Sequence, residues 1–281
     1  MFLSLPSTVS QPARRQPLIQ SMLLALVILW CAALLIPPTW LADAGLSLNA
    51  HGHQHVYAHG HPFVDARSFG GIPNAMDVLS NLPFLLAGIW GLRLLRHPGN
   101  AWVVENRSAA SVFFVGLCLT ALGSATYHWA PNAWTLVGDR LGMAVSFAGA
   151  MGLVLAHRAD RSTAQIAMWG MLLLAAVSSA MPAVHDQVLP WAVVQFGGVA
   201  LILVAAAVRP DASKPRLAVG ALIALYLVAK LLEMGDAWAF EATGHWISGH
   251  SLKHLVAAMA AWPVCAAIVN RFPAKPQAEC A

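Results

Sequence analysis

Residues 248–262 read SGHSLKHLVAAMAAW, and they open an apolar run that continues to about residue 271. His250 and His254 lie four residues apart near the start of this run. An α-helix places side chains at i and i+4 on one side, so both imidazoles would point in the same direction. About 20 apolar residues are enough to cross a bilayer. The stretch therefore predicts a membrane-spanning helix that carries two histidines near one end.

The composition of the whole chain also indicates a membrane protein. Of its 281 residues, 58% are hydrophobic and only 10% are charged, whereas soluble domains carry about 25% charged residues. The net charge of +4 fits basic residues placed in short loops, where they orient membrane helices. These basic residues do not alternate with aromatic side chains, so we do not expect nucleic acid as a partner.

Eight apolar runs are long enough to span a membrane, which predicts an all-α, polytopic membrane helical bundle. They cover residues 19–41, 75–96, 108–130, 134–156, 164–181, 188–208, 216–239 and 250–271. The first run follows Arg14 and Arg15 as in a signal peptide, but no clear A-x-A site follows it, which favours a retained helix.

The runs divide the chain into five parts. We expect an N-terminal segment 1–18, an extra transmembrane helix 19–41, a histidine-rich outer loop 42–74, a seven-helix core 75–271 and a tail 272–281. The fold is therefore predicted as a seven-helix core plus one extra N-terminal helix. The oligomeric state stays open.

The distribution of Lys and Arg predicts how the bundle is oriented. Basic residues concentrate in every second loop, and such loops face the cytoplasm. These loops hold Arg93, Arg96, Arg107, Arg158, Arg161, Arg209, Lys214, Arg216, Arg271 and Lys275, whereas the opposite segments hold little more than Arg67. Both termini are then cytoplasmic, and the start of the last helix lies near the outer, periplasmic or lumenal, face.

This topology brings His128, Asp139, His250 and His254 to one level of the bundle, although they come from three segments. Ionisable groups inside a membrane are costly and usually mark a functional site. Three histidines with one open position are the ligand set of a catalytic zinc ion. Alternatively, the histidines at these helix ends are satisfied by backbone or water alone.

Two further side chains lie close to the predicted zinc ligands. Ser124 precedes His128 by one helical turn, and its hydroxyl would stabilise a developing oxyanion or simply bond the carbonyl four residues back. Asp139 would accept a proton from zinc-bound water, hold a histidine in place, or pair with a buried cation.

Taken together, these motifs resemble the alkaline ceramidases. The resemblance rests on S-x-x-x-H at Ser124 and His128, Asp139 eleven residues later, and H-x-x-x-H at His250 and His254. The segment DVLSNLPFLLAG, residues 77–88, is similar to the segment that opens the first core helix of that family. The likeness covers residues 65–271. It extends to the wider superfamily of seven-helix membrane hydrolases, with adiponectin-type receptors and enzymes that remodel the lipid of GPI anchors.

The resemblance implies a zinc ion held by His128, His250 and His254, assisted by Ser124 and Asp139, and a lipid amide as substrate. The family's acidic, calcium-binding segment has no close counterpart, because FVDARSFGGIPNAMDVLSN, residues 63–81, has few acids and includes Arg67. We therefore do not expect calcium. A receptor or metal-binding protein of the same fold, and an ester-cleaving lipid hydrolase, remain as alternatives.

Other polar residues have less specific interpretations. His51, His53, His55, His59 and His61 would capture metal or form a solvated loop. Lys230 and Glu233, three residues apart, predict an ion pair, and Asp236 is the residue of this group that would contact a substrate cavity. Arg140 and Lys253 would pair with carboxylates or with a lipid headgroup.

Overall fold

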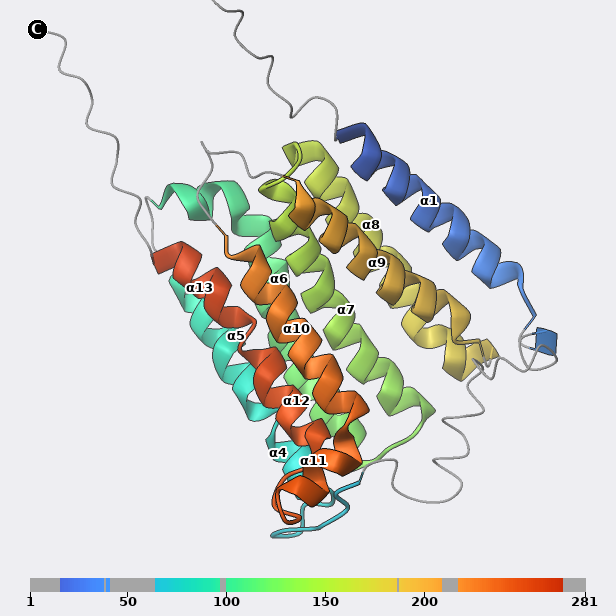
Figure 1. The fold of residues 1–281 in the computed structure, drawn as a ribbon, viewed down its shortest axis with the longest axis vertical. Coiled ribbons are helices and arrows are strands. Elements are labelled where there is room, and N and C mark those ends of the chain that lie inside the picture. The colour runs from blue at the N-terminus through green and yellow to red at the C-terminus, as the bar shows by residue number, and fades with distance from the viewer. Residues whose placement is uncertain are drawn as a thin grey trace, which may run out of the picture.

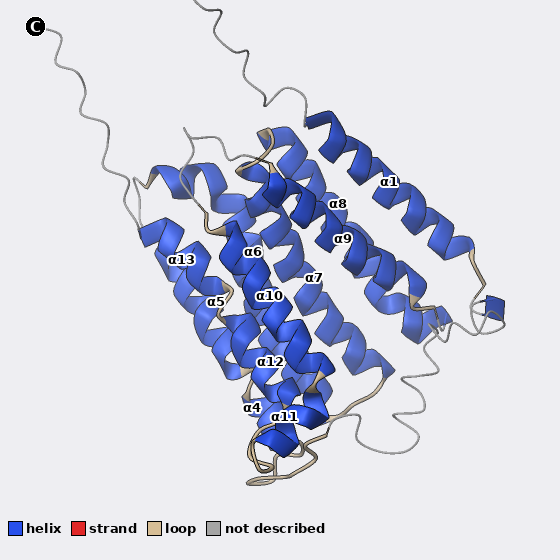
Figure 2. Cartoon of the chain, in the orientation of Figure 1, coloured by secondary structure: helices blue, strands red, loops and turns tan. Residues whose placement is uncertain are grey.

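The computed structural model describes residues 16–37, 39–40, 64–96, 100–185, 187–208 and 217–269. Within these ranges all the main secondary-structure elements are helices (Figures 1 and 2). The one β contact among the described residues is an isolated bridge between Phe69 and Ile72. The predicted all-α fold is confirmed. The five histidines of residues 51–61 lie outside the described residues, as do both chain ends.

Seven helical segments are long and apolar enough to cross a membrane, so the chain is a multi-pass membrane protein. They are α1 (Gln16–Leu35), α4 and α5 together (Ala75–Leu79, Leu82–Leu94), α6 (Ala101–Trp129), α7 (Ala133–Ala156), α8 (Arg161–His185), α9 (Leu189–Ala207), and α12 and α13 together (Gly249–Ala258, Ala261–Val269). Each overlaps a predicted run, and α1 is the extra N-terminal helix.

The run predicted at 216–239 is divided in two. Helix α10 covers Val219–Met234, only 16 residues, and the short helix α11 begins at Asp236 and ends at Ala242. Gly235 separates the two helices. Helix α10 nevertheless belongs to the bundle, because it packs against α12. The division matters for the site, since it places Asp236 at the start of a helix rather than inside a span.

Helices α6 and α7 form the centre of the bundle (Figure 1), and small residues let them approach closely. A Cβ atom on Gly123 would come within 2.3 Å of the Gly138 carbonyl oxygen, a distance that no side chain tolerates. Further along the crossing, Gly149 of α7 lies against the buried Phe113 of α6. The close crossing fixes the relative positions of the residues that follow each glycine.

The extra helix α1 packs along α8 and α9 at one side of the bundle (Figure 1). Polar contacts fix its position along these helices. The indole Nε1 of Trp30 donates to Ser178 Oγ at 2.7 Å, and the side chain of Gln187 donates to the Ile36 carbonyl at 2.6 Å. Near its other end, Gln16 donates to the Asp160 carboxylate.

The two ends of the bundle differ in charge. Arg93 lies in the last turn of α5, and Arg158 and Arg161 lie where α7 gives way to α8. In Figure 1 these helix ends lie opposite to α4, α11 and the start of α12. The described arginines of the predicted cytoplasmic loops therefore gather at one end, and the predicted outer histidines at the other. Which end faces the cytoplasm stays a prediction.

Candidate metal centre

Three histidines from two distant segments meet at one end of the bundle. His128 lies in the last turn of α6, and His250 and His254 lie on α12. The ring centroids are 4.8 Å apart for His128 and His250, 5.1 Å for His128 and His254, and 4.8 Å for His250 and His254. One nitrogen from each ring lies within 4.8 Å of the others. The structure thus brings together the three residues predicted as metal ligands.

The spacing of these nitrogens suits a metal ion. His128 Nε2 and His250 Nε2 are 3.2 Å apart. Two nitrogen ligands of a tetrahedral ion, each about 2.0–2.1 Å from it, lie about 3.3 Å apart. His128 and His254 are buried and His250 is partly buried, and neutral imidazole is the form that both burial and coordination favour. The cluster could hold a metal ion, whose identity the geometry alone does not set.

Ser80 fixes the orientation of His254, a role that the sequence analysis did not assign. Its hydroxyl oxygen lies 2.8 Å from His254 Nδ1 and donates its own proton to the Asp77 carbonyl at 3.0 Å. The Nδ1 atom must therefore carry the ring proton and donate it to Ser80. This tautomer leaves a lone pair on Nε2, and such outer hydrogen bonds orient metal-binding imidazoles.

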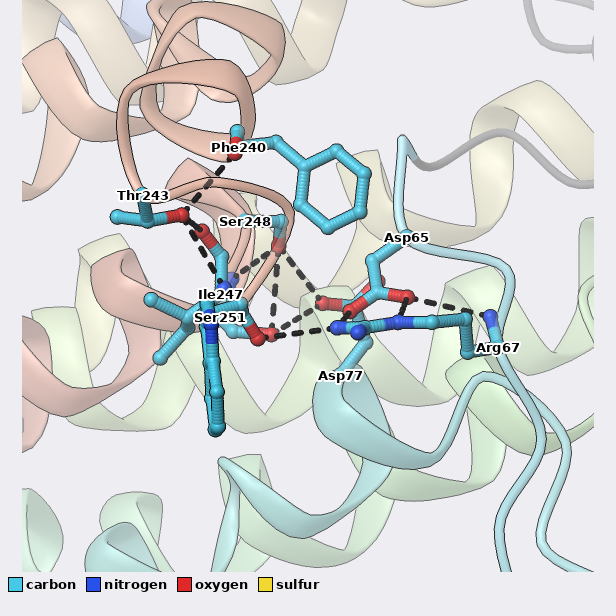
Figure 3. A network of polar contacts seen from close by, with 9 residues as sticks. Asp65, Arg67, Asp77, Phe240, Thr243, Ile247, Ser248 and Ser251 are labelled. Atoms are coloured by element: carbon cyan, nitrogen blue, oxygen red, sulfur yellow. Dashed lines mark hydrogen bonds and ion pairs between the residues drawn. The ribbon is translucent and has the colours of Figure 1, made fainter.

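Asp77 ties the first core helix to the histidine helix, and this role was also missed. The Asp77 side chain is completely buried, and its Oδ1 accepts from Ser251 Oγ at 2.7 Å and from Ser248 Oγ at 3.3 Å (Figure 3). Ser248 also caps α12 by accepting from the Ser251 amide at 3.0 Å. The start of α12 is therefore held on α4, one turn before Ser80.

The predicted pair Ser124 and Asp139 is assembled where α6 and α7 cross. The Asn132 side chain caps α7 by accepting from the amides of Trp134 and Thr135, which sets where that helix begins. Because Gly123 and Gly138 allow close contact, Ser124 and Asp139 come together, with the serine close enough to act on the carboxylate. Ser124 is buried and Asp139 partly buried. Asp139 lies outside the cluster of metal-ligand candidates.

An ion-pair network borders the histidines on the other side. Lys230 and Glu233 form the predicted pair, and Glu233 also accepts from Lys253 at 3.1 Å. Lys253 Nζ lies 3.2 Å from His250 Nε2, and its charge also acts on Asp139. Asp236, the residue of this group that would contact a substrate cavity, accepts from the His250 backbone amide at 2.8 Å. It therefore anchors the first turn of α12.

Arg140 follows Asp139 in the chain and packs on an aromatic ring. Its guanidinium lies over the ring of Trp191, 5.4 Å from the ring centroid, and its charge acts on the neighbouring Asp139. The aromatic contact helps to position the guanidinium, and its pairing with a carboxylate or a lipid headgroup stays a prediction.

The segment before α4 closes over this end of the bundle. Arg67 donates two hydrogen bonds to the buried Asp65 carboxylate, at 2.7 and 2.8 Å, and a third to the Trp246 carbonyl at 2.9 Å (Figure 3). Hydrogen bonding to Asp65 raises the pKa of Arg67. The Asn74 side chain donates to the His128 carbonyl at 2.8 Å. The side chains of Asp65 and Asn74, which come from the segment compared with the calcium-binding region of the ceramidases, thus both make structural contacts.

A shallow apolar groove lies on the outer side of the α6–α7 crossing. Its volume is about 390 Å³, and it is lined by Leu122, Gly123, Thr126, Trp134, Thr135 and Gly138. The two glycines are the sequence neighbours of Ser124 and Asp139. The groove therefore lies on the same stretch of α6 and α7 as this pair.

Comparison with known proteins does not extend these observations. No family model matches the chain, and neither the curated proteins nor the solved structures include one that matches it significantly. The resemblance to alkaline ceramidases therefore rests on the motifs alone.

Proposed function

We propose that this protein is a zinc-dependent membrane hydrolase that cleaves the amide bond of ceramide or a related N-acyl lipid. The observation that carries the proposal is the meeting of His128, His250 and His254 beside the pair of Ser124 and Asp139. A set of three imidazoles is typical of catalytic rather than structural zinc. The order of the motifs, which is that of the alkaline ceramidases, supports a lipid amide as the substrate.

The donor set fits zinc on two grounds. Imidazole nitrogen is a preferred zinc ligand, and the 3.2 Å separation of two Nε2 atoms matches that of two ligands of one tetrahedral ion. The Ser80 hydrogen bond also prepares His254 Nε2 as a donor. Zinc bound there would polarise the amide carbonyl and lower the pKa of a water molecule to about 7.

The protein's own residues would handle the protons. Asp139 would accept a proton from the attacking water and return it to the nitrogen of the leaving amine, so that an amide and water become a carboxylic acid and an amine. Ser124 lies beside Asp139, a position from which it would orient that carboxylate. Oxyanion stabilisation by Ser124 stays a prediction.

The lipid would approach from the membrane. The groove on α6 and α7 is apolar and lies directly behind the Gly123–Gly138 crossing. An acyl chain seated there would place its polar end near Asp139, at the level where headgroups meet hydrocarbon. The exposed Trp129 and Trp134 beside the groove are suited to that interfacial level.

The test combines metal analysis with a matched substrate pair. Purified protein should contain about one zinc per chain, and the double variant His250→Ala, His254→Ala should lose it. The loaded protein should release fatty acid from an N-acyl sphingoid amide faster than from the ester with the same chain. Faster ester cleavage would assign the protein to an ester hydrolase. Zinc binding without any turnover would favour a receptor or metal-binding protein.

A further inference from the structure

Lys253 places an ammonium group against the histidine cluster. It lies between His250 and His254 in the sequence, and its Nζ is 3.2 Å from His250 Nε2 and 3.5 Å from His250 Nδ1. Its side chain is only 17% exposed. A buried lysine is costly unless its charge is balanced, so the surrounding charges decide what this group can bind.

The side chains around Lys253 carry one more negative than positive charge before any metal is counted. The positive ones are Lys230, Lys253 and Arg140, and the negative ones are Glu233, Asp139, Asp236 and Asp77. A divalent ion on three neutral imidazoles would add two positive charges, and the ligand cluster contains no carboxylate among the described residues. The occupied site therefore needs negative charge from a bound molecule.

Glu233 does not remove this need. It contacts both Lys230 and Lys253, through different carboxylate oxygens. One carboxylate shared by two ammonium groups leaves a unit of positive charge. Of the two lysines, only Lys253 contacts a predicted metal ligand. It is thus the cation that an anionic group at the histidines would meet.

We infer that Lys253 binds an anionic oxygen of the lipid, so that the site prefers carboxylate-bearing acyl lipids to neutral ones. The inference rests on the proposed function for the position of the lipid at the histidines. The anionic oxygen has two chemical sources. It belongs either to a headgroup carboxylate next to the scissile bond or to the fatty acid carboxylate that cleavage releases.

The inference can be tested without catalysis by measuring the equilibrium binding of ligands that have no amide or ester bond to cleave. Oleyloxyacetate carries a carboxylate at the headgroup position, and oleyloxyethanol is its neutral counterpart. Oleate carries the carboxylate at the position of the cleaved product, and oleyl alcohol is its neutral counterpart. Affinities are measured by calorimetry in one detergent with zinc-loaded protein, and zinc content and melting temperature are recorded for every variant.

The protein should bind at least one of the two carboxylates about ten- to a hundredfold more tightly than its neutral counterpart, as expected for charge-assisted hydrogen bonds. Lys253→Met should abolish this preference, and Lys253→Arg should retain it. Lys230→Met should weaken the preference without abolishing it, because it leaves Glu233 to pair with Lys253 alone.

The ligand pairs also identify the source of the anion. If Lys253 is needed for a preference for oleyloxyacetate, the anion that it binds is a headgroup carboxylate. If Lys253 is needed only for a preference for oleate, the anion is the carboxylate of the released fatty acid. The same preference in Lys253→Met, or no preference in the unaltered protein, overturns the inference. If the preference is present but no amide is hydrolysed, the proposed function fails while the binding role of Lys253 stands.

Discussion

The polar residues at the histidine end of this bundle act on one another rather than singly. The Asp77 backbone and side chain contact Ser80, Ser248 and Ser251, and Ser80 in turn contacts His254. A buried polar group without a partner is expensive in a membrane, so each hydrogen bond here both stabilises the fold and sets an orientation. In the same way, Ser124 lies beside the Asp139 carboxylate.

Asp139 is the residue whose substitution best separates catalysis from structure. Asp139→Asn keeps the shape and most hydrogen bonding but cannot accept a proton. Turnover of an N-acyl sphingoid should fall by about 10²–10⁴-fold, the usual contribution of a general base. Zinc content should not change, because Asp139 is not a member of the ligand cluster. Retained turnover with retained zinc would remove Asp139 from the mechanism, and a large loss of melting temperature would indicate a structural role.

Ser80 should influence metal affinity without binding metal itself. Ser80→Ala removes the acceptor for the His254 Nδ1 proton, and loss of such a contact typically weakens metal binding by about 10–100-fold. Competition with a chromophoric chelator measures the affinity. Ser178→Ala is the control, since Ser178 is an equally buried serine that contacts Trp30 instead. Equal zinc affinity in both variants would contradict the role of Ser80.

At the scale of helices, the α6–α7 crossing is the contact that aligns Ser124 with Asp139. Gly123→Ala would place a Cβ atom 2.3 Å from the Gly138 carbonyl, so the helices must separate. Such overpacking costs about 1–3 kcal/mol, or several degrees of melting temperature, and should lower turnover by displacing Ser124 from Asp139. Gly170→Ala on α8 meets nothing within 4 Å and should change neither. An unchanged Gly123→Ala protein would contradict this account.

The start of α8 depends on Asp160, which lies at the opposite end of the bundle. Its carboxylate accepts from the Thr163 amide at 2.9 Å and hydroxyl at 2.7 Å, and from the Ser162 hydroxyl. Hydrogen bonds, above all that of Ser162, hold the pKa of Asp160 below its ordinary value. A lowered pKa in the folded state means that this stabilisation is present above the unfolded pKa of about 3.9 and is lost as the pH falls below it.

Asp160→Ala should therefore lower the melting temperature at pH 7, because it removes the helix cap, a change typically worth about 1 kcal/mol. The difference from the unaltered protein should shrink when the pH falls below about 4, because Asp160 of the unfolded chain takes up a proton there while that of the folded protein does not. Ser162→Ala, which removes only one of the hydrogen bonds, should show a smaller effect with the same pH dependence. A difference that is equal at pH 3 and pH 7 would contradict this explanation. Thermal unfolding in detergent across this range is the measurement.

For the whole molecule, hydrophobic run length predicted the helical bundle well because a bilayer imposes one length on every span. Topology then predicted the meeting of His128 with His250 and His254, since helix ends of the same side must share one level. Run length failed at residues 216–239, where Gly235 and Asp236 interrupt an apolar pattern. The roles of Asp77 and Ser80 were missed because their partners lie more than 170 residues away. The one sequence signal for a role of these two residues was their position in the segment 77–88, which resembles the ceramidases.

The orientation of the molecule in the membrane is the last prediction. The described arginines of the predicted cytoplasmic loops lie at one end and the histidine cluster at the other, so the positive-inside rule places the histidines on the outer side. The termini and their basic residues lie outside the described residues, and cysteine labelling reaches the described ends instead. In a cysteine-free background, His245→Cys marks the exposed loop before α12, and Ser162→Cys marks the start of α8.

A membrane-impermeant maleimide added to intact cells should label His245→Cys and should label Ser162→Cys only after the membrane is opened. The two positions lie on exposed parts of opposite ends, so each serves as the control for the other. Because an apolar bundle fixes all its spans together, the two labels must reverse jointly if the orientation is wrong. The reversed pattern would place the candidate metal centre on the cytoplasmic side, and the proposed lipid substrate would then come from the inner leaflet.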